Sequence, residues 1–212
     1  LLYENDGVAT SILLEYGLNF DNVKNAIQQE LGDIETSVKT YSNLPESLES
    51  YFIHVPGLKV VCPSNAYDAK GLLKTAIRDD NPVLFFEHKL LYGSKGNRSE
   101  KGSISPISEV PLYDYTIPFG KGIIRKKGRH ITLLGKLRTV YSSIEAANEL
   151  ERENILCEII DPRTLVPLDI NLIINSVKKT GHLIIVDECT KTGGWAGEIA
   201  ATVQEKIFPS SN

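Results

Sequence analysis

The residues best suited to bind a ligand form a polar turn at the end of a predicted helix. Asp79 and Asn81 stand in this turn, just before Pro82. Carbonyl groups at a helix C-terminus carry partial negative charge, and a hard cation prefers oxygen ligands. The same residue types also favour a plain helix stop ahead of a proline. From the residues alone the helix stop is the favoured interpretation, with a cation site as the alternative.

The histidines lack the neighbours that a metal site or a catalytic triad requires. No Cys or carboxylate stands at a spacing typical of such sites, so each histidine is interpreted as a turn or strand-edge residue. Glu87 and His88 follow a predicted buried strand. Because strand C-terminal ends face ligands in α/β folds, these two residues are alternative candidates for a cofactor-facing edge. The four histidines are His54, His88, His130 and His182.

A glycine-rich turn opens the last predicted helix. Gly193 and Gly194, with Gly197, could form a phosphate cradle at a helix N-terminus. Their spacing does not fit G-x-G-x-x-G, so close packing of helix on strand is favoured, with Trp195 anchoring an interface.

Two further sites carry charge directly after predicted strands. Gly135 and Lys136 lack the spacing of a P-loop. Asp161 and Arg163 are expected to pair with each other or to contact a neighbouring subunit.

Charge and composition exclude several classes of partner. The formal net charge of −4 gives no electrostatic reason to expect nucleic acid. No apolar run approaches the roughly 18 residues of a membrane span. The densest basic cluster is interpreted as a turn between strands, and it comprises Arg125, Lys126, Lys127 and Arg129.

The cysteines indicate a reducing compartment. Cys62, Cys157 and Cys189 are widely spaced, form no C-x-x-C pair and lie in or beside apolar runs. Such cysteines behave as small hydrophobic residues, and a zinc site is not expected. The sequence contains no Met and begins without a signal-peptide core, so its first residue need not be a natural start.

The chain divides into a helical segment, a linker and an α/β region. Residues 1–33 predict two short helices, and residues 34–46 predict a linker because they lack a clean period. Residues 47–212 alternate apolar strands with amphipathic helices, which predicts a mostly parallel sheet covered on both faces. The strands are predicted at 58–61, 83–86, 131–134, 156–160 and 183–186. The helices are predicted after Ser64 or Asn65 and at 140–151, 170–179 and 197–207. A long loop after residue 93 divides this region into subdomains at 47–115 and 116–212.

Three blocks within this region resemble one family. PGLKVVCPSNAYDAKGLLKTAIRDDNPVLFFEHKLLY at residues 56–92 is similar to the beta subunit of the first component of pyruvate dehydrogenase and related 2-oxo acid dehydrogenases. DPRTLVPLD at 161–169 and DECTKTGGWAGEIAATVQEKIF at 187–208 resemble the C-terminal domain of that subunit, shared with transketolases. The resemblance covers residues 47–208. It implies an α/β fold: the end of a thiamine-pyrimidine-binding domain followed by a three-layer, transketolase-type C-terminal domain.

The resemblance also implies a multienzyme setting. In the family, the beta subunit joins an alpha subunit in a heterotetramer, contacts the dihydrolipoyl acyltransferase core and works with thiamine diphosphate. The family His that acts near thiamine aligns with Leu44, and the region of the family Glu is replaced by the N-terminal helices. No catalytic or cofactor-binding residue is therefore assigned, and no thiamine turnover is expected from this chain alone. Pyruvate is the expected substrate of the parent assembly, with acetoin and branched-chain 2-oxo acids as alternatives.

At the polar turn, the resemblance makes the cation site the favoured interpretation in place of a plain helix stop. The family binds a structural potassium ion around the corresponding turn, and the matching positions are Ala76, Ile77, Asp79 and Asn81. A further family ligand lies in a part of the subunit to which this chain shows no resemblance, which weakens the expected affinity.

A second resemblance concerns the N-terminal segment. GVATSILLEYGLNFDNVKNAIQQELG, at residues 7–32, resembles the last helices of the N-terminal domain of Clp-type chaperone ATPases. Two alternatives follow. The segment is an interaction module that recruits a chaperone partner, or the chain is a composite in which sequences of two different families are joined within the linker. Both parent families occur in bacteria and plastids, which suggests a source without fixing a compartment.

Overall fold

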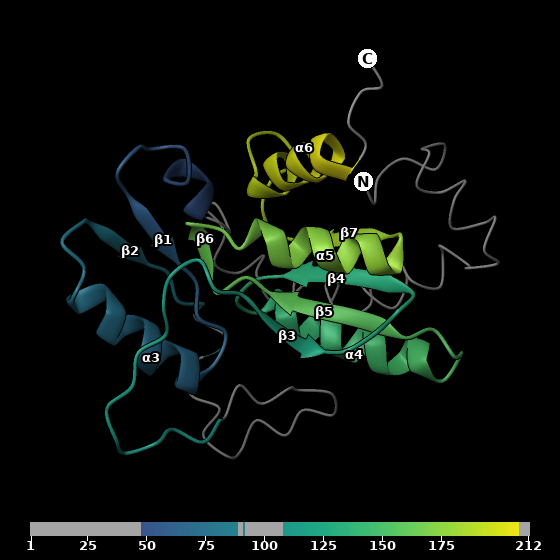
Figure 1. Cartoon of the computed structure of the whole chain (residues 1–212), viewed down its shortest axis with the longest axis horizontal. Coiled ribbons are helices and arrows are strands. Elements are labelled where there is room, and N and C mark those ends of the chain that lie inside the picture. The colour runs from purple at the N-terminus through teal and green to yellow at the C-terminus, as the bar shows by residue number, and fades with distance from the viewer. Residues whose placement is uncertain (1–47, 89–90, 92–107, 208–212) are drawn as a thin grey trace, which may run out of the picture.

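The computed structural model describes residues 48–88, 91 and 108–207 (Figure 1). The Clp-like segment at 1–33, the linker at 34–46 and Leu44 lie outside these described residues. Among the described residues, no helix has both the length and the apolar character needed to cross a membrane.

The described chain contains two β-sheets. The first has the order β2-β1-β6, with β1 parallel to β2 and antiparallel to β6. Its strands are β1 (Lys59–Val61), β2 (Val83–Phe85) and β6 (Thr164–Val166). The second has the order β3-β5-β4-β7, with β4 parallel to both of its neighbours and β3 antiparallel to β5. Its strands are β3 (Ile123–Lys126), β4 (Ile131–Gly135), β5 (Cys157–Asp161) and β7 (Leu183–Val186).

Local sequence signals explain where the helices begin and end. The α-helices are α3 (Ala66–Ile77), α4 (Thr139–Glu151), α5 (Ile170–Thr180) and α6 (Trp195–Ile207), and a 3-10 helix, η1, spans Glu49–Tyr51. Asn65 caps α3, because its side-chain oxygen accepts a hydrogen bond of 2.8 Å from the backbone N–H of Asp68. Asp169 caps α5, and Gly181, with a φ of 75°, ends it in the left-handed conformation.

Helices cover both faces of the four-stranded sheet. On one face, Val140 and Leu150 of α4 pack against Leu133 and Ile159. On the other face, α5 and α6 pack against Leu134 and Ile160 in a second cluster. Figure 1 shows the sheet between α4 and α5. The alternating sides of neighbouring strand residues produce this three-layer arrangement.

The two sheets share one of these cores. Val60 of β1 and Leu165 of β6 belong to the same cluster as α5 and α6, whereas Val61 faces Leu72 of α3 and Ile117. Strand β6 lies in the predicted second subdomain, but it pairs with β1 of the first. The subdomains are therefore joined by both a shared sheet and a shared core.

The predicted strands and helices of the described residues are present, with ends that differ by one or two residues. Two short antiparallel strands, β3 and β6, were not predicted. The basic cluster was interpreted from the sequence as a turn between strands, and Lys127 and Arg129 do lie in the connection between β3 and β4, whereas Arg125 and Lys126 belong to β3 itself. The strand has only two apolar residues, Ile123 and Ile124, before its charged end, so no alternating pattern marks it in the sequence.

Candidate functional site

The four predicted cation ligands lie on one turn after α3. Ala76 and Ile77 are the last residues of the helix, and the backbone N–H of Asp79 donates to the Ala76 carbonyl at 3.3 Å. Asp79 Oδ1 accepts hydrogen bonds from the backbone and side-chain nitrogens of Asn81, at 2.9 and 2.8 Å. Asp79 Oδ2 pairs with the ammonium of Lys59. The hydrogen bond from Lys59, followed by those from Asn81, lowers the pKa of Asp79 to about 2.

Lys59 already supplies a positive charge to this turn. Within the described residues, no group of three or more His, Cys, Asp and Glu side chains could hold a metal ion. The turn therefore offers carbonyl and amide oxygens around one neutralised carboxylate, a donor set that suits a weakly charged hard cation better than a divalent one. The cation site remains a prediction.

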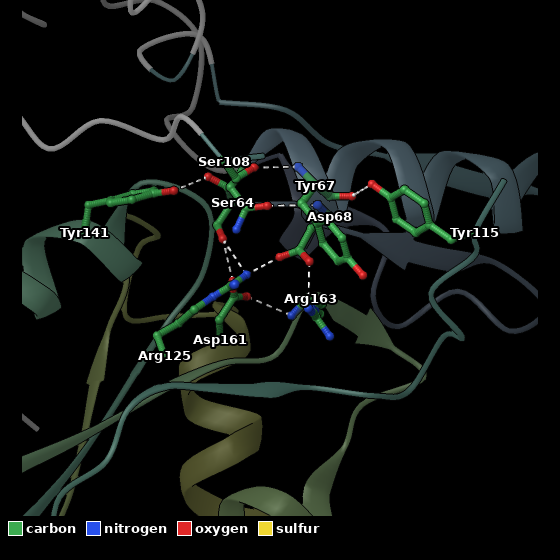
Figure 2. A network of polar contacts seen from close by, with 10 residues as sticks. Ser64, Tyr67, Asp68, Ser108, Tyr115, Arg125, Tyr141, Asp161 and Arg163 are labelled. Carbon is green, nitrogen blue, oxygen red and sulfur yellow. Dashed lines mark hydrogen bonds and ion pairs between the residues drawn. The ribbon is translucent and has the colours of Figure 1, made fainter. Parts of the chain in front are cut away.

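A second group of polar residues, the Arg–Asp junction, joins α3 to the four-stranded sheet (Figure 2). It consists of Ser64, Asp68, Arg125, Asp161 and Arg163. Asp68, in the first turn of α3, and Asp161, at the end of β5, are fully buried. Their carboxylates meet two guanidinium groups, so the four charges of the junction balance.

The hydrogen bonds of the junction leave little freedom to its side chains. Asp68 Oδ1 accepts from Arg163 Nη2 at 2.7 Å, and Asp68 Oδ2 pairs with Arg125. Asp161 Oδ2 accepts from Arg125 Nε at 3.1 Å, from Arg125 Nη2 at 2.7 Å and from Ser64 Oγ at 2.5 Å. Asp161 Oδ1 accepts from the backbone N–H of Arg163 at 2.9 Å. The expected pairing of Asp161 with Arg163 thus involves the backbone, while the Arg163 guanidinium binds Asp68.

Burial and charge act in opposite directions on these groups. Burial lowers the pKa of Arg125, whereas the charges of Asp161 and Asp68 raise it. The net shift is upward, so the guanidinium stays protonated. Tyr141 donates a hydrogen bond of 2.8 Å to the Ser64 carbonyl, and burial raises its pKa to about 12. The junction is a permanently charged connection between α3 and the sheet, in which each carboxylate is paired with a guanidinium and the buried Arg163 Nε lacks a hydrogen-bond partner among the described residues.

Figure 2 also shows how the segment after residue 108 is held over α3. Ser108 Oγ accepts from the Tyr67 backbone N–H at 2.8 Å, and the Tyr115 hydroxyl donates to the Tyr67 carbonyl at 2.8 Å. The Tyr67 and Tyr115 rings stack with centroids 4.6 Å apart. These contacts direct the chain from the first subdomain into the second.

A third group, the Lys136 cluster, gathers at the carboxyl ends of β4 and β7. It comprises Glu49, Lys136 and Asp187. Lys136 Nζ lies 3.2 Å from Glu49 Oε1 and 3.0 Å from Asp187 Oδ1. All three side chains are nearly inaccessible, with exposed fractions of 5% for Glu49, 2% for Lys136 and 6% for Asp187.

The electrostatics of the Lys136 cluster follow from two carboxylates around one cation. Burial lowers the pKa of Lys136, but Asp187 and Glu49 raise it further and keep the ammonium charged. Burial raises the pKa of Asp187 by more than Lys136 lowers it. Asp187 can therefore take up a proton more readily than an ordinary carboxylate, whereas the guanidiniums of the Arg–Asp junction keep their charge.

The residues after Asp187 extend this connection between the subdomains. His88 Nε2 lies 3.1 Å from Glu188 Oε2, and Ser50 Oγ lies 2.8 Å from Cys189 Sγ. Burial raises the pKa of Glu188, whereas the hydrogen bond and the charge of His88 lower it. The net shift is downward. His88 thus forms a contact between the two sheets, while Glu87 is exposed.

Trp195 and Gly194 both lie in closely packed surroundings at the beginning of α6. Trp195 is 2% exposed and packs in the core cluster with Ile199 and Val203, and its expected role at an interface stays a prediction. An added Cβ on Gly194 would lie 2.4 Å from the Thr190 carbonyl oxygen, which supports the packing interpretation at that position.

Sequence reasoning missed the central residues of both ionic groups. Asp68 and Lys136 were not singled out as partners, because their contacts involve residues far away in the chain. The available signal was a charged side chain directly beside a buried element: Asp68 in the first turn of α3 and Lys136 directly after β4.

Comparison with known proteins identifies the two domain types. Residues 39–95 match the family described as the transketolase pyrimidine-binding domain, and residues 120–211 match the transketolase C-terminal domain. The first match begins within the segment that the sequence pattern assigns to a linker. These matches agree with the α/β architecture and its mostly parallel sheets.

Several beta subunits are similar to this chain. The beta subunit of mitochondrial 2-oxoisovalerate dehydrogenase from Dictyostelium discoideum is 47% identical over 166 residues, which is 77% of this chain and 41% of that protein. An acetoin:2,6-dichlorophenolindophenol oxidoreductase beta subunit from Cupriavidus necator is 44% identical over 163 residues, 77% of this chain and 45% of that protein. The beta subunit of the pyruvate dehydrogenase E1 component from Bacillus subtilis is 42% identical over 165 residues, 78% of this chain and 47% of that protein. The chain spans less than half the length of these relatives.

A solved structure has the same fold at lower identity. It is described as a split-gene transketolase in an inactive beta4 tetramer, with a TM-score of 0.58 and 23% identity. The similarity covers 76% of this chain and 48% of that one.

Proposed function

We propose that this chain, a homologue of 2-oxo acid dehydrogenase beta subunits with transketolase-like pyrimidine-binding and C-terminal domains, has an assembly and cation-binding role without catalysis. Its proposed partners are an alpha subunit and the dihydrolipoyl acyltransferase core of the same multienzyme complex. The Arg–Asp junction is the observation that carries the proposal. Its charges are paired across the subdomain boundary, so the chain can present both subdomains to a partner as one rigid unit.

Thiamine diphosphate does not fit the described residues as a catalytic cofactor. The pyrimidine-binding domain is that of a thiamine-dependent family. At the carboxyl end of β2, however, His88 is already paired with Glu188. After β1, the Ser64 hydroxyl is bound to Asp161. General acid–base work requires a group that can reach the cofactor and exchange a proton with it, so we derive no catalytic step from these side chains.

The proposed cation is a potassium ion at the turn formed by Ala76, Ile77, Asp79 and Asn81. The support is the resemblance of these four positions to the potassium-binding turn of the family, together with the carboxylate of Asp79, which is ionised above pH about 2. A melting curve in KCl should lie above the curve in an equal concentration of choline chloride. Equal melting temperatures in both salts would contradict the cation site and leave the assembly role untouched.

Pyruvate is the proposed substrate of the parent assembly. The support is the resemblance of residues 56–92 to pyruvate dehydrogenase beta subunits and the similarity to the Bacillus subtilis protein. Relatives named for 2-oxoisovalerate and acetoin have identities of 47% and 44%, so the three assignments must be separated by experiment. Binding to the alpha subunits of the three enzymes should be measured in parallel, and the pyruvate alpha subunit should bind most tightly.

Calorimetric titration tests the absence of catalysis. Thiamine diphosphate with Mg²⁺ should produce no saturable heat with this chain alone. It should do so with an intact pyruvate dehydrogenase heterotetramer as the positive control. Saturable binding by the chain alone, or 2-oxo acid-dependent reduction of a dye, would refute the non-catalytic proposal.

A further inference from the structure

A cavity of about 830 Å³ lies between η1, the segment that follows β6 and the beginning of α6. Its walls are mostly apolar and include Leu165, Leu168 and Ile199, while its polar lining includes His54 and Lys191. Cavities of roughly 300–1,000 Å³ with apolar walls and a few polar groups are typical of small-molecule sites. The cavity is separate from the polar turn and from the Arg–Asp junction, and neither assembly nor cation binding uses it.

Trp195 supplies a hydrogen-bond donor beside this cavity. The residue lines the cavity and is 2% exposed, and its Nε1 has no hydrogen-bond partner among the described residues. An indole nitrogen can only donate, and a buried donor without an acceptor is unfavourable. A ligand oxygen that accepts from Trp195 would remove this cost.

Gly197 keeps one wall of the cavity open. It lies in the first turn of α6, and glycine is a poorer helix former than alanine. An added Cβ would meet no atom within 4 Å, in contrast to the close contact found at Gly194. Packing therefore does not require a glycine at position 197, whereas a larger side chain there would extend into the open space.

The charges around the cavity favour a single negative charge. Lys191 and His54 contribute positive or ionisable nitrogen groups, and the N-terminal end of α6 adds partial positive charge. Glu198 also lines the cavity and disfavours a second negative charge. We propose that this cavity binds a small organic monoanion with an apolar body, which accepts a hydrogen bond from Trp195 and is attracted by Lys191.

Two fluorescent probes of similar shape separate the apolar and anionic parts of the proposal. The anion 8-anilinonaphthalene-1-sulfonate and the neutral N-phenyl-1-naphthylamine share an anilinonaphthalene body. Trp195 is the one tryptophan in the sequence, so quenching of its emission reports on the cavity directly. The full chain should be titrated with each probe, and its affinity and stoichiometry measured.

Variants of the lining provide the test. Gly197→Leu should weaken both probes by about tenfold. Its melting temperature should not fall, because leucine is the better helix former. Gly197→Ala should give a smaller loss of the same kind. Lys191→Ala should weaken the sulfonate by about threefold and leave the neutral probe unchanged. The matched control is Lys206→Ala. Lys206 is an exposed lysine of α6 outside the cavity, and its removal should alter neither affinity.

The outcomes decide between the cavity and other apolar surfaces. Unchanged sulfonate binding in both Gly197 variants would place the probe elsewhere and overturn the proposal. Equal effects of Lys191→Ala on the two probes would overturn the requirement for an anion.

Discussion

The Arg–Asp junction and the Lys136 cluster both use buried charges to join the subdomains, but their charges respond differently to the loss of a partner. The junction balances two carboxylates against two guanidiniums, and guanidiniums do not deprotonate in proteins. The Lys136 cluster sets two carboxylates around one ammonium. A carboxylate can be neutralised by protonation. The stability lost when Lys136 is removed should therefore be partly regained in acid, whereas the stability lost when an aspartate of the junction is removed should not.

The comparison shows that burial alone does not define the energetic role of an ion pair. Asp68 and Lys136 are similarly inaccessible. The side chains left behind after each is removed have very different pKa values, and this determines the cost at each pH.

Asp68→Ala should have the largest effect. It leaves two partly buried guanidiniums with incomplete pairing and should lower the free energy of unfolding by about 3–5 kcal/mol. Urea denaturation measures this loss, which should persist between pH 5 and 8 because the guanidiniums stay charged. The matched control is Asp80→Ala on the exposed turn. A loss no greater than that of the control would mean that the junction does not hold the subdomains.

Lys136→Met should have a smaller and pH-dependent effect. It leaves Glu49 and Asp187 without their cation and should cost about 1–3 kcal/mol at neutral pH. The loss should shrink as the pH falls, since Asp187, whose pKa burial raises, then takes up a proton in the folded state. Parallel denaturation curves at pH 5 and pH 8 test this sign. A cost that stays constant or grows in acid would contradict the proposed difference between the two groups.

His88→Phe should remove part of the acid sensitivity of the protein. The folded pKa of Glu188 lies below its usual value of 4.5, so the His88 contact stabilises the chain above that pH and is lost as the pH falls through the folded pKa. The variant should lose about 1 kcal/mol at pH 6 and less at pH 3. The double variant with Glu188→Gln distinguishes the pair from its separate residues. Additive effects of the two substitutions would show that the contact contributes nothing.

Asp79→Asn should have the smallest effect, and this effect should disappear in acid. The pKa of Asp79 falls from 3.8 to about 2, so its contribution is complete above pH 3.8 and disappears as the pH approaches 2. Melting temperatures of the variant and the original chain should converge as the pH falls through that window. A difference that persists unchanged to pH 2 would show that Lys59 is not the source of the shift.

The sequence predicts the helices and parallel strands well for a physical reason. Apolar periodicity and capping residues such as Asn65 act over a few neighbouring positions, so they are visible without the fold. Strand β6 is too short for such a pattern, and its place beside β1 depends on the tertiary arrangement.

The polar groups were harder to predict than the elements that carry them. Arg125 reaches Asp161 across 36 residues, and Arg163 reaches Asp68 across 95. No local spacing encodes such contacts. The cation turn was predicted because its residues are nearly contiguous and resemble a family motif, and its occupancy remains to be measured.

Native mass spectrometry of the chain mixed with the alpha subunit of a pyruvate dehydrogenase tests the proposed assembly role most directly. A heteromer that contains both subunits should form at micromolar concentration, and Asp68→Ala should reduce it because the ion pairs that fix α3 against the four-stranded sheet are then lost. The absence of any heteromer under conditions where an intact beta subunit assembles would contradict the proposed function.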